Sequence, residues 1–194
     1  MKHLLALLSI ALCLPAAAQT LDKLTYNCEL DVAQACYAAG SLHYLGDGTT
    51  VNYENSANFY QRGCDLGGAQ SCYMIGSQRY EGLGVTQDHL QAIWLFNLSC
   101  KMGSESGCFR IANEYYDGIV LQNNGIEAAR YYTLACQTSQ PTYPSTAAQG
   151  CMNIGLMYLR GFSVEEDIVR AADFFERACF LGEARGCQAL VDEF

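Results

Sequence analysis

The stretch IGSQRYEGLGVTQDHLQAIWLF, residues 75–96, carries the pattern from which the fold can be predicted. A small residue, Gly76, is followed one helical turn later by Tyr80 and then by a glycine stop, which is typical of a packed helix and its C-terminus. Asp88 is a good N-cap, and an apolar helical face that includes Phe96 follows it. The stretch therefore predicts two antiparallel helices joined by a short loop.

The same pattern recurs along the chain at a nearly constant spacing. Paired cysteines stand at positions 28 and 36, 64 and 72, 100 and 108, 136 and 151, and 179 and 187. The second member of each pair and the first member of the next are always 28 residues apart, whereas seven extra residues stand within the fourth pair. A fixed period of this length indicates a repeat array in which each unit is one helix pair.

Each repeat carries its own core and capping positions. The first helix has a small residue, a large residue one turn later and a glycine stop: Gly40, Tyr44 and Gly46; Gly76, Tyr80 and Gly82; Ala112, Tyr116 and Gly118; Gly155, Leu159 and Gly161. The second helix follows the N-caps Asn52, Asp88, Asn124 and Asp167, and its inward face carries Ala57 and Tyr60, Ile93 and Phe96, Ala129 and Tyr132, and Ala172 and Phe175. We interpret these aromatic columns as core and not as a ligand cage.

Four such units are expected at about residues 35–70, 71–106, 107–149 and 150–185, preceded by a partial helix at 21–30 and followed by a C-terminal stub at 186–194. A helix pair cannot bury its apolar face alone, whereas stacked pairs bury a continuous core. The predicted fold is therefore all-α, a short curved α/α solenoid of about four repeats.

Residues 1–18 have the layout of a secretory signal. Lys2 precedes an apolar run at residues 4–14, and small residues stand before the expected cleavage point after Ala18. We therefore expect a mature solenoid at residues 19–194 that resides in the periplasm or outside the cell.

The composition argues against several classes of function. Removal of the signal takes Lys2 and no acid, so the formal net charge moves from −9 to −10, which disfavours nucleic-acid binding. No later stretch approaches the roughly 20 apolar residues that a membrane-spanning helix needs. Eleven cysteines minus Cys13 of the signal leave ten, an even number in an exported protein, where disulfides persist.

The repeat resembles a known family. The order small residue, Tyr-x-Gly-x-Gly-Val, Asp and an Ala-rich aromatic helix in residues 75–96 is similar to the Sel1-like repeat (SLR), and cysteine pairs with seven residues between them resemble its exported cysteine-rich branch, the Hcp proteins. The resemblance covers nearly all of the mature chain and implies a right-handed, TPR-like superhelix. The departures are an insert, QTSQPTYPSTAAQG at 137–150, and Val120 and Ser163 in place of the second turn glycine.

Two schemes of cysteine pairing fit the repeat. Pairing across 28 residues strands Cys28 and Cys187 at opposite ends, whereas pairing across the short gap uses all ten cysteines and joins chain ends that already lie close. We predict the bonds Cys28–Cys36, Cys64–Cys72, Cys100–Cys108, Cys136–Cys151 and Cys179–Cys187. Zinc sites and redox pairs favour shorter spacings, so we expect no metal and no cofactor.

Patterns for catalysis are scarce. The mature lysines are Lys23 and Lys101, and neither completes a Ser-x-x-Lys motif; Lys-Thr-Gly and Ser-Asp-Asn are also absent. His43 and His89 have no local partner, so we interpret His43 as an exposed or half-buried solenoid residue and His89 as a surface residue. No catalytic residue is predicted, and the chain is not expected to be an enzyme.

Surface positions of the first helices are the remaining candidates. The first helices of a solenoid usually line its concave side. Positions two, six and nine after each second cysteine differ between repeats: Ala38, Leu42 and Leu45; Met74, Gln78 and Glu81; Arg110, Glu114 and Asp117; Asn153, Met157 and Arg160. We expect a partner to be recognised by Leu42, Gln78, Arg79, Glu114, Tyr115 and Met157; the alternative is ordinary solvated surface. The insert is either a second contact element or a tolerated insertion.

The leading hypothesis is an exported scaffold that binds another protein through its concave face, without nucleic acid and without a membrane span; the oligomeric state is not predicted. The resemblance adds two narrower hypotheses. Some exported SLR proteins are similar to immunity proteins that neutralise toxins such as phospholipases. Penicillin binding with slow β-lactam hydrolysis has been attributed to Hcp proteins, and it ranks third because no residue here matches a lactamase motif.

Overall fold

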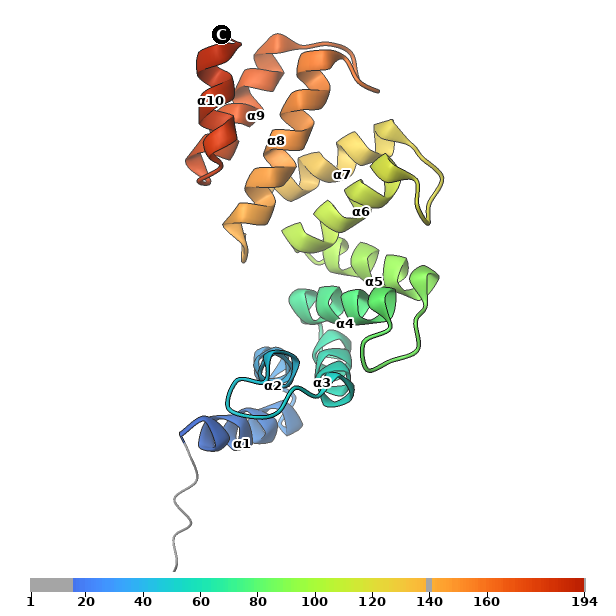
Figure 1. Cartoon of the computed structure of the whole chain (residues 1–194), viewed down its shortest axis with the longest axis vertical. Helices are drawn as coiled ribbons and strands as arrows, with labels where there is room; N and C mark the ends of the chain where they lie inside the picture. Colours follow the sequence, from blue (N-terminus) through green and yellow to red (C-terminus); the bar gives the residue numbers. More distant parts are fainter. Residues whose placement is uncertain (1–15, 139–140, 194) are drawn as a thin grey trace, which may run out of the picture.

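The computed structural model describes residues 16–138 and 141–193, which form ten α-helices and no strand. The helices are α1 Ala16–Glu29, α2 Ala33–Leu45, α3 Tyr53–Asp65, α4 Ala69–Glu81, α5 His89–Lys101, α6 Glu105–Asp117, α7 Gly125–Gln137, α8 Pro144–Arg160, α9 Ile168–Phe180 and α10 Ala184–Asp192. They stack pairwise into a curved array, so the predicted all-α solenoid is confirmed (Figure 1). Most of the expected signal, residues 1–15, lies outside the described residues, and α1 begins earlier than the expected partial helix.

The helices begin and end at the predicted capping residues. Side-chain oxygens of Asn52, Asp88, Asn124 and Asp167 accept hydrogen bonds from the backbone N–H three residues later. Gly46, Gly82, Gly118 and Gly161 end the first helices in the left-handed region, with φ between 60° and 73°. Ser163 also has a positive φ, 59°, so it follows the turn that Gly48 and Gly84 make in earlier repeats.

The core follows from close packing between the two helices of a pair. A Cβ atom added at Gly40 would lie 2.7 Å from the Tyr60 ring, and one at Gly155 would lie 2.6 Å from Phe175. The inward aromatic positions of the second helices are buried in every repeat. Small residues on the first helix therefore let an aromatic ring of the second helix sit directly against its backbone.

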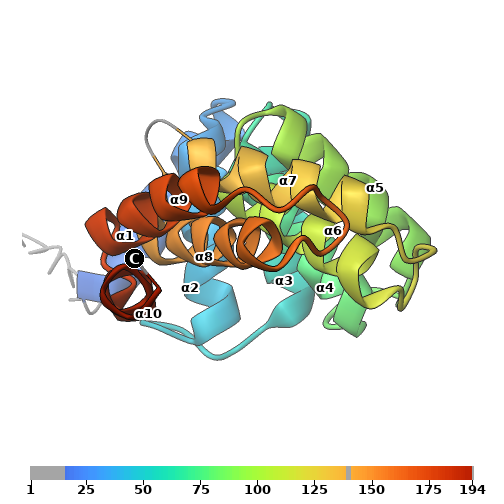
Figure 2. The same ribbon diagram turned by 90° about the horizontal axis from the view of Figure 1, so that it is seen from above.

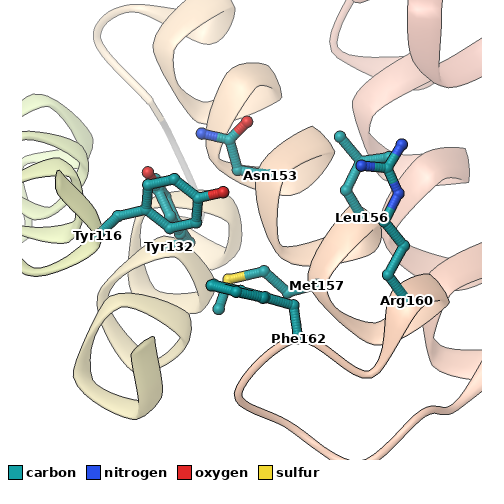
Figure 3. A pocket seen from close by; sticks show the side chains of 7 residues that line it. All are labelled: Tyr116, Tyr132, Asn153, Leu156, Met157, Arg160 and Phe162. Atoms are coloured by element: carbon teal, nitrogen blue, oxygen red, sulfur yellow. The ribbon is translucent and has the colours of Figure 1, made fainter. Parts of the chain in front are cut away.

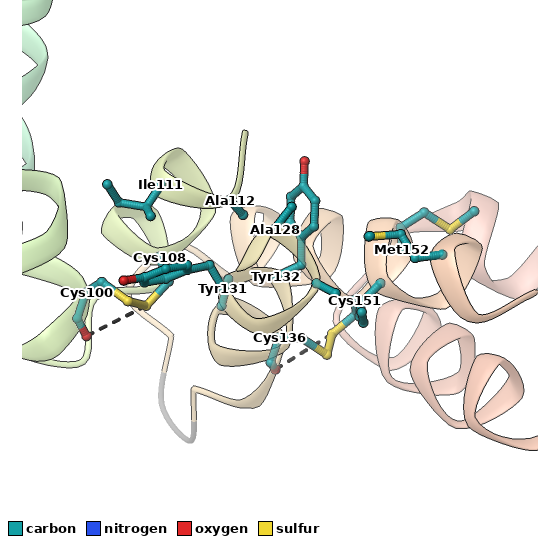
Figure 4. Packing of buried hydrophobic residues seen from close by; sticks show 14 of the residues in the cluster. Cys100, Cys108, Ile111, Ala112, Ala128, Tyr131, Tyr132, Cys136, Cys151 and Met152 are labelled. Atoms are coloured by element: carbon teal, nitrogen blue, oxygen red, sulfur yellow. Dashed lines mark hydrogen bonds between the residues drawn. A yellow bond between two sulfur atoms is a disulfide. The ribbon is translucent and has the colours of Figure 1, made fainter. Parts of the chain in front are cut away.

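All five predicted disulfides are present, with S–S distances of 1.98 to 2.06 Å. Four of them join the end of one helix to the start of the next, whereas Cys136–Cys151 joins the end of α7 to the middle of α8. Figure 4 shows two of the five beside the buried aromatic residues of the core. Closing an eight-residue loop stabilises the fold by about 2–3 kcal/mol in the chain-entropy model. Such a framework is typical of proteins outside the reducing cytoplasm.

The helix pairs form an inner and an outer layer. The first helices α2, α4, α6 and α8 contact one another in sequence, and the second helices α3, α5 and α7 each pack against the first helix of their own pair and that of the next. Successive pairs are also rotated about the long axis, so that α5 and α10 lie on opposite sides of the view from above (Figure 2). We call the side formed by α2, α4, α6 and α8 the inner surface.

No helix within the described part of the chain is long and apolar enough to cross a membrane.

The insert in the fourth repeat contacts earlier repeats of the same chain. It lengthens α8 to 17 residues, where the other first helices α2, α4 and α6 have 13. Tyr143, just before α8, shares a hydrogen bond between its hydroxyl and that of Tyr37 on α2, and its N–H donates to Glu105 Oε1 at 2.6 Å. The curvature of the solenoid therefore brings the start of the fourth repeat against the first and third.

Candidate binding surface

The sixth position after each second cysteine does not lie on exposed surface. Gln78, Glu114 and Met157 are 0%, 1% and 4% exposed, so the expectation that these three side chains lie on the surface, as partner contacts or as solvated residues, was wrong. The reason is their helical phase, which turns them toward the neighbouring repeat. Gln78 Nε2, for example, donates to the carbonyl oxygens of Tyr53 at 3.0 Å and Leu83 at 3.2 Å, and thereby joins the start of α3 to the turn after α4.

Arg79 and Tyr115 stand seven residues after the second cysteine, so they belong to a different column from positions two, six and nine. In this column Tyr115 stacks on Tyr131 of α7, with ring centroids 5.8 Å apart, and His43 stacks on Phe59 of α3 at 5.5 Å. These positions therefore lie against the second helices, and Arg79, Tyr115 and Leu42 are all half-buried. His43 is buried rather than exposed or half-buried, and burial lowers its pKa. His89 is exposed, as predicted.

The site between α4 and α6 is filled by the chain itself. The Arg110 guanidinium lies 4.2 Å from the centroid of the Tyr80 ring and 5.6 Å from that of Phe96. Its Nη2 is 3.2 Å from Glu114 Oε1, so the buried carboxylate has a counter-ion. We call Tyr80, Phe96, Arg110 and Glu114 the closed site, because a cation and its acid occupy the space between the helices.

The corresponding site between α6 and α8 is open. It is a cavity of about 280 Å³ lined by residues of α6, α7, α8 and the loop after α8: Tyr116, Tyr132, Asn153, Leu156, Met157, Arg160 and Phe162. Figure 3 shows Tyr116 and Tyr132 on one side of the space and Leu156 and Arg160 on the other. Tyr132 and Met157 are buried, while Tyr116 and Phe162 are 43% and 49% exposed. We call these seven residues the open site.

The two sites differ at matched positions of the repeat. Two residues after the second cysteine, Met74 packs against a core cluster shared by the first and second repeats, Arg110 fills the closed site, and Asn153 is too short to fill the open one. Six residues after the cysteine, Glu114 is replaced by Met157. The cavity is therefore the space that a long side chain takes up in the two preceding repeats.

The polar groups of the open site are few and fixed. The Tyr132 hydroxyl donates to Asn113 Oδ1 at 2.7 Å, and burial raises the pKa of Tyr132 to about 12, so it stays protonated at neutral pH. Among the described residues, no carboxylate lies within ion-pair distance of Arg160. The site thus offers aromatic and aliphatic walls, one side-chain amide and one unpaired cation.

Sequence reasoning located part of this site. Asn153, Met157 and Arg160 are among the positions two, six and nine after each second cysteine, which sequence analysis had proposed as candidates. Leu156 and Phe162 were missed, and the column that contains Tyr116 was interpreted only as core. A sequence signal did exist, since Asn153 is the one short polar residue in a column that otherwise holds Ala38, Met74 and Arg110.

The two histidines of the described part of the chain lie against aromatic rings. His43 and His89 contact the rings of Phe59 and Tyr80, and neither is hydrogen-bonded to a serine or a carboxylate in residues 16–138 and 141–193. In the same ranges, no group of three or more histidine, cysteine, aspartate or glutamate side chains is arranged to hold a metal ion.

Comparison with known proteins identifies the repeat. Residues 33–68, 69–104, 106–137 and 148–182 each match the model of the Sel1 repeat. No curated protein matches the chain at a significant level.

Several solved structures share the fold. A protective antigen of uropathogenic Escherichia coli with an SLR fold is 22% identical (TM-score 0.76), and the match covers 88% of this chain but 35% of that one. A Sel1 repeat protein from Oxalobacter formigenes is 16% identical (TM-score 0.78), with 88% and 66% covered. Helicobacter pylori cysteine-rich protein B is 24% identical (TM-score 0.54), with 71% and 94% covered. The chain therefore spans about a third and two thirds of the first two structures, and the likeness extends to the fold.

Proposed function

This chain belongs to the Sel1 repeat family, and from that premise we propose that it is an exported scaffold that binds a protein partner on its inner surface. A Sel1 repeat solenoid suits protein–protein interaction because its rigid first helices present a long, continuous surface. The disulfides support a location outside the cytoplasm, in the periplasm or the surrounding medium.

The single observation that carries this proposal is the open site between α6 and α8. Tyrosine and other aromatic side chains dominate the energetics of binding surfaces, and a concave apolar pocket is where an anchoring side chain is desolvated. Two disulfides, Cys100–Cys108 and Cys136–Cys151, hold the helices that line it, so the site is formed before a partner arrives.

The narrower hypotheses name particular functions for the same scaffold. Neutralisation of an exported toxin such as a phospholipase would be one use of the inner surface, and protection of cells that co-express the toxin and this chain tests it. Weak β-lactam hydrolysis has no support in the side-chain contacts described above, and a nitrocefin assay on concentrated, oxidised protein tests it directly.

The proposal is tested by affinity capture from exported fractions of the source cells. The bait is the oxidised wild-type chain beside Asn153→Met, which fills the open site, and Phe180→Ser, which alters an exposed apolar residue that does not line that site. The proposal expects one protein that the wild type and Phe180→Ser retain and that Asn153→Met loses. Equal retention by all three baits, or none by the wild type, contradicts it.

A further inference from the structure

We infer that the open site takes an uncharged apolar side chain of the partner, next to a carboxylate on the same partner segment that pairs with Arg160. This inference rests on the proposed function and names the chemistry of the ligand. It comes from the two preceding repeats, where the chain fills the matched space with its own side chains.

The closed site shows what a cation needs in this position. Arg110 is held by the faces of two aromatic rings, but it is also paired with Glu114 at 3.2 Å. Glu114 is itself buried, so the cation and its acid leave water together. A guanidinium that leaves water requires such partners, because desolvation of an unpaired charge is costly.

The open site lacks the acid that pairs with the cation in the closed site. Met157 stands where Glu114 stands in the closed site, and Arg160 stands where Asp117 stands. An arginine or lysine of a partner would meet aromatic faces without a counter-ion and would be repelled by Arg160. The site therefore disfavours the occupant that the closed site holds.

An apolar side chain meets none of these penalties. Met74, at the position of Asn153, shows that a methionine packs into the equivalent part of the second repeat. The walls offered by Tyr116, Met157 and Phe162 are apolar or aromatic, and the thioether of a methionine makes favourable contacts with aromatic rings. A side chain of this length and polarity would replace the missing one.

The flanking carboxylate follows from the unpaired Arg160. The chain as a whole is acidic, with a formal net charge of −9, but charges farther away than about 8 Å are screened at physiological salt. Arg160 is the one charged residue among the seven that line the site. On the opposite side, Asp117 lies near enough to Tyr132 to contribute to the raised pKa of that hydroxyl, yet it does not line the cavity.

The test is an NMR titration of the oxidised mature chain with capped tetrapeptides. The probe is acetyl-Gly-Met-Glu-Gly-amide, and its two matched variants carry Arg in place of Met or Gln in place of Glu. We expect the methyl signals of Met157 and Leu156 to shift with the probe. Affinity should fall by about tenfold for the Arg peptide, which brings an unpaired cation, and by about threefold for the Gln peptide, which loses a partly exposed ion pair.

Two variants and a control separate the features of the site. Asn153→Met should abolish the shifts while its five disulfides remain formed and its thermal stability is not lowered, whereas the control Phe180→Ser should bind as the wild type does. Arg160→Gln should bind the Glu and Gln peptides equally. Tighter binding of the Arg peptide, shifts outside the open site, or no shift at millimolar peptide would overturn the inference.

The outcomes also distinguish this inference from the proposed function. If a partner protein is captured by the wild type and lost by Asn153→Met, but the Arg peptide binds best or no peptide binds, the ligand chemistry is wrong and the scaffold function stands. If the Met–Glu peptide binds as expected but no partner is captured, the chemistry stands and the scaffold proposal fails.

Discussion

The closed site between α4 and α6 and the open site between α6 and α8 occupy the same place in consecutive repeats. Both have an aromatic residue at the end of a first helix and a buried ring on a second helix: Tyr80 and Phe96 in one, Tyr116 and Tyr132 in the other. They differ in the side chain that enters the space, because Arg110 fills the first and Asn153 leaves the second empty. The comparison teaches that the repeat determines which aromatic residues line the space between two first helices. The residue at a single position then decides whether that space is filled by the chain or is open to a partner.

The largest effect should come from breaking the closed site. Arg110→Ala leaves the buried Glu114 without its counter-ion and removes a cation from the rings of Tyr80 and Phe96. The free energy of unfolding should fall by about 2–3 kcal/mol, since a stranded buried charge is costly. Urea denaturation under oxidising conditions measures it.

The double variant Arg110→Ala with Glu114→Gln is the control. It strands no charge, so it should be more stable than Arg110→Ala alone. Glu114→Gln alone completes the comparison. If the losses of unfolding free energy of the two single variants simply add in the double variant, the ion pair does not stabilise the closed site.

Filling the open site should have the next largest effect, of opposite sign. Asn153→Met supplies the long apolar side chain that Met74 supplies in the second repeat, and cavity filling of this kind stabilises by about 1 kcal/mol. Asn153→Arg should give no gain because Met157 and Arg160 provide no acid. Asn153→Ala gives the baseline without filling, and thermal unfolding compares the three. Equal stabilisation by Met and Arg contradicts the distinction between the sites.

Tyr132→Phe makes the open site resemble the closed one, which has Phe96 at this position. The hydrogen bond to Asn113 is lost, so stability at neutral pH should fall by about 1 kcal/mol. The wild-type pKa of Tyr132 is raised from 10.0 to about 12 in the folded chain. The unfolded chain therefore ionises first, and this contribution is fully present below pH 10 and lost between pH 10 and 12.

The pH dependence of this variant is a measurable difference. Between pH 10 and 12, the free energy of unfolding should decline less steeply for Tyr132→Phe than for the wild type, with the remaining decline including that of Tyr60, whose pKa is also about 12. Urea denaturation at short times across this range reports it. Identical slopes would mean that Tyr132 is not held in its protonated form by burial.

The smallest effect on stability should come from the exposed rim. Phe162 and the matched Ile119 are 49% and 70% exposed, so replacing either with Ala should change the free energy of unfolding by less than about 0.5 kcal/mol. Only Phe162→Ala should weaken partner binding, because Phe162 lines the open site and Ile119 does not. Equal losses of binding from both variants would remove the distinction.

Much of the fold was predictable because each repeat carries the residues that start, end and pack its own two helices. Asn52 and its equivalents start a helix, Gly46 and its equivalents end one, and Gly40 against Tyr60 sets the distance within a pair. These features act over a few residues and recur with the period. The cysteine spacing then sufficed to predict all five disulfides.

The binding surface was less predictable because it depends on the angle between repeats. Periodicity places Gln78 and Glu114 on one side of a helix, but only the packing of one first helix against the next shows that this side is buried. The contact between Tyr37 and Tyr143, 106 residues apart in sequence, likewise depends on the curvature of the whole solenoid. Such geometry accumulates over several repeats and is not contained in any one of them.

The central claim is that the open site, and not its closed counterpart, is where this chain meets its partner. Placing the photo-crosslinking residue benzoylphenylalanine at Phe162 or at the matched Ile119, and measuring the yield of the crosslinked partner in exported fractions, tests that claim most directly. The account predicts a specific adduct from position 162, its loss when Asn153→Met is added, and none from position 119. An adduct of equal yield from both positions, or from position 119 alone, would contradict it.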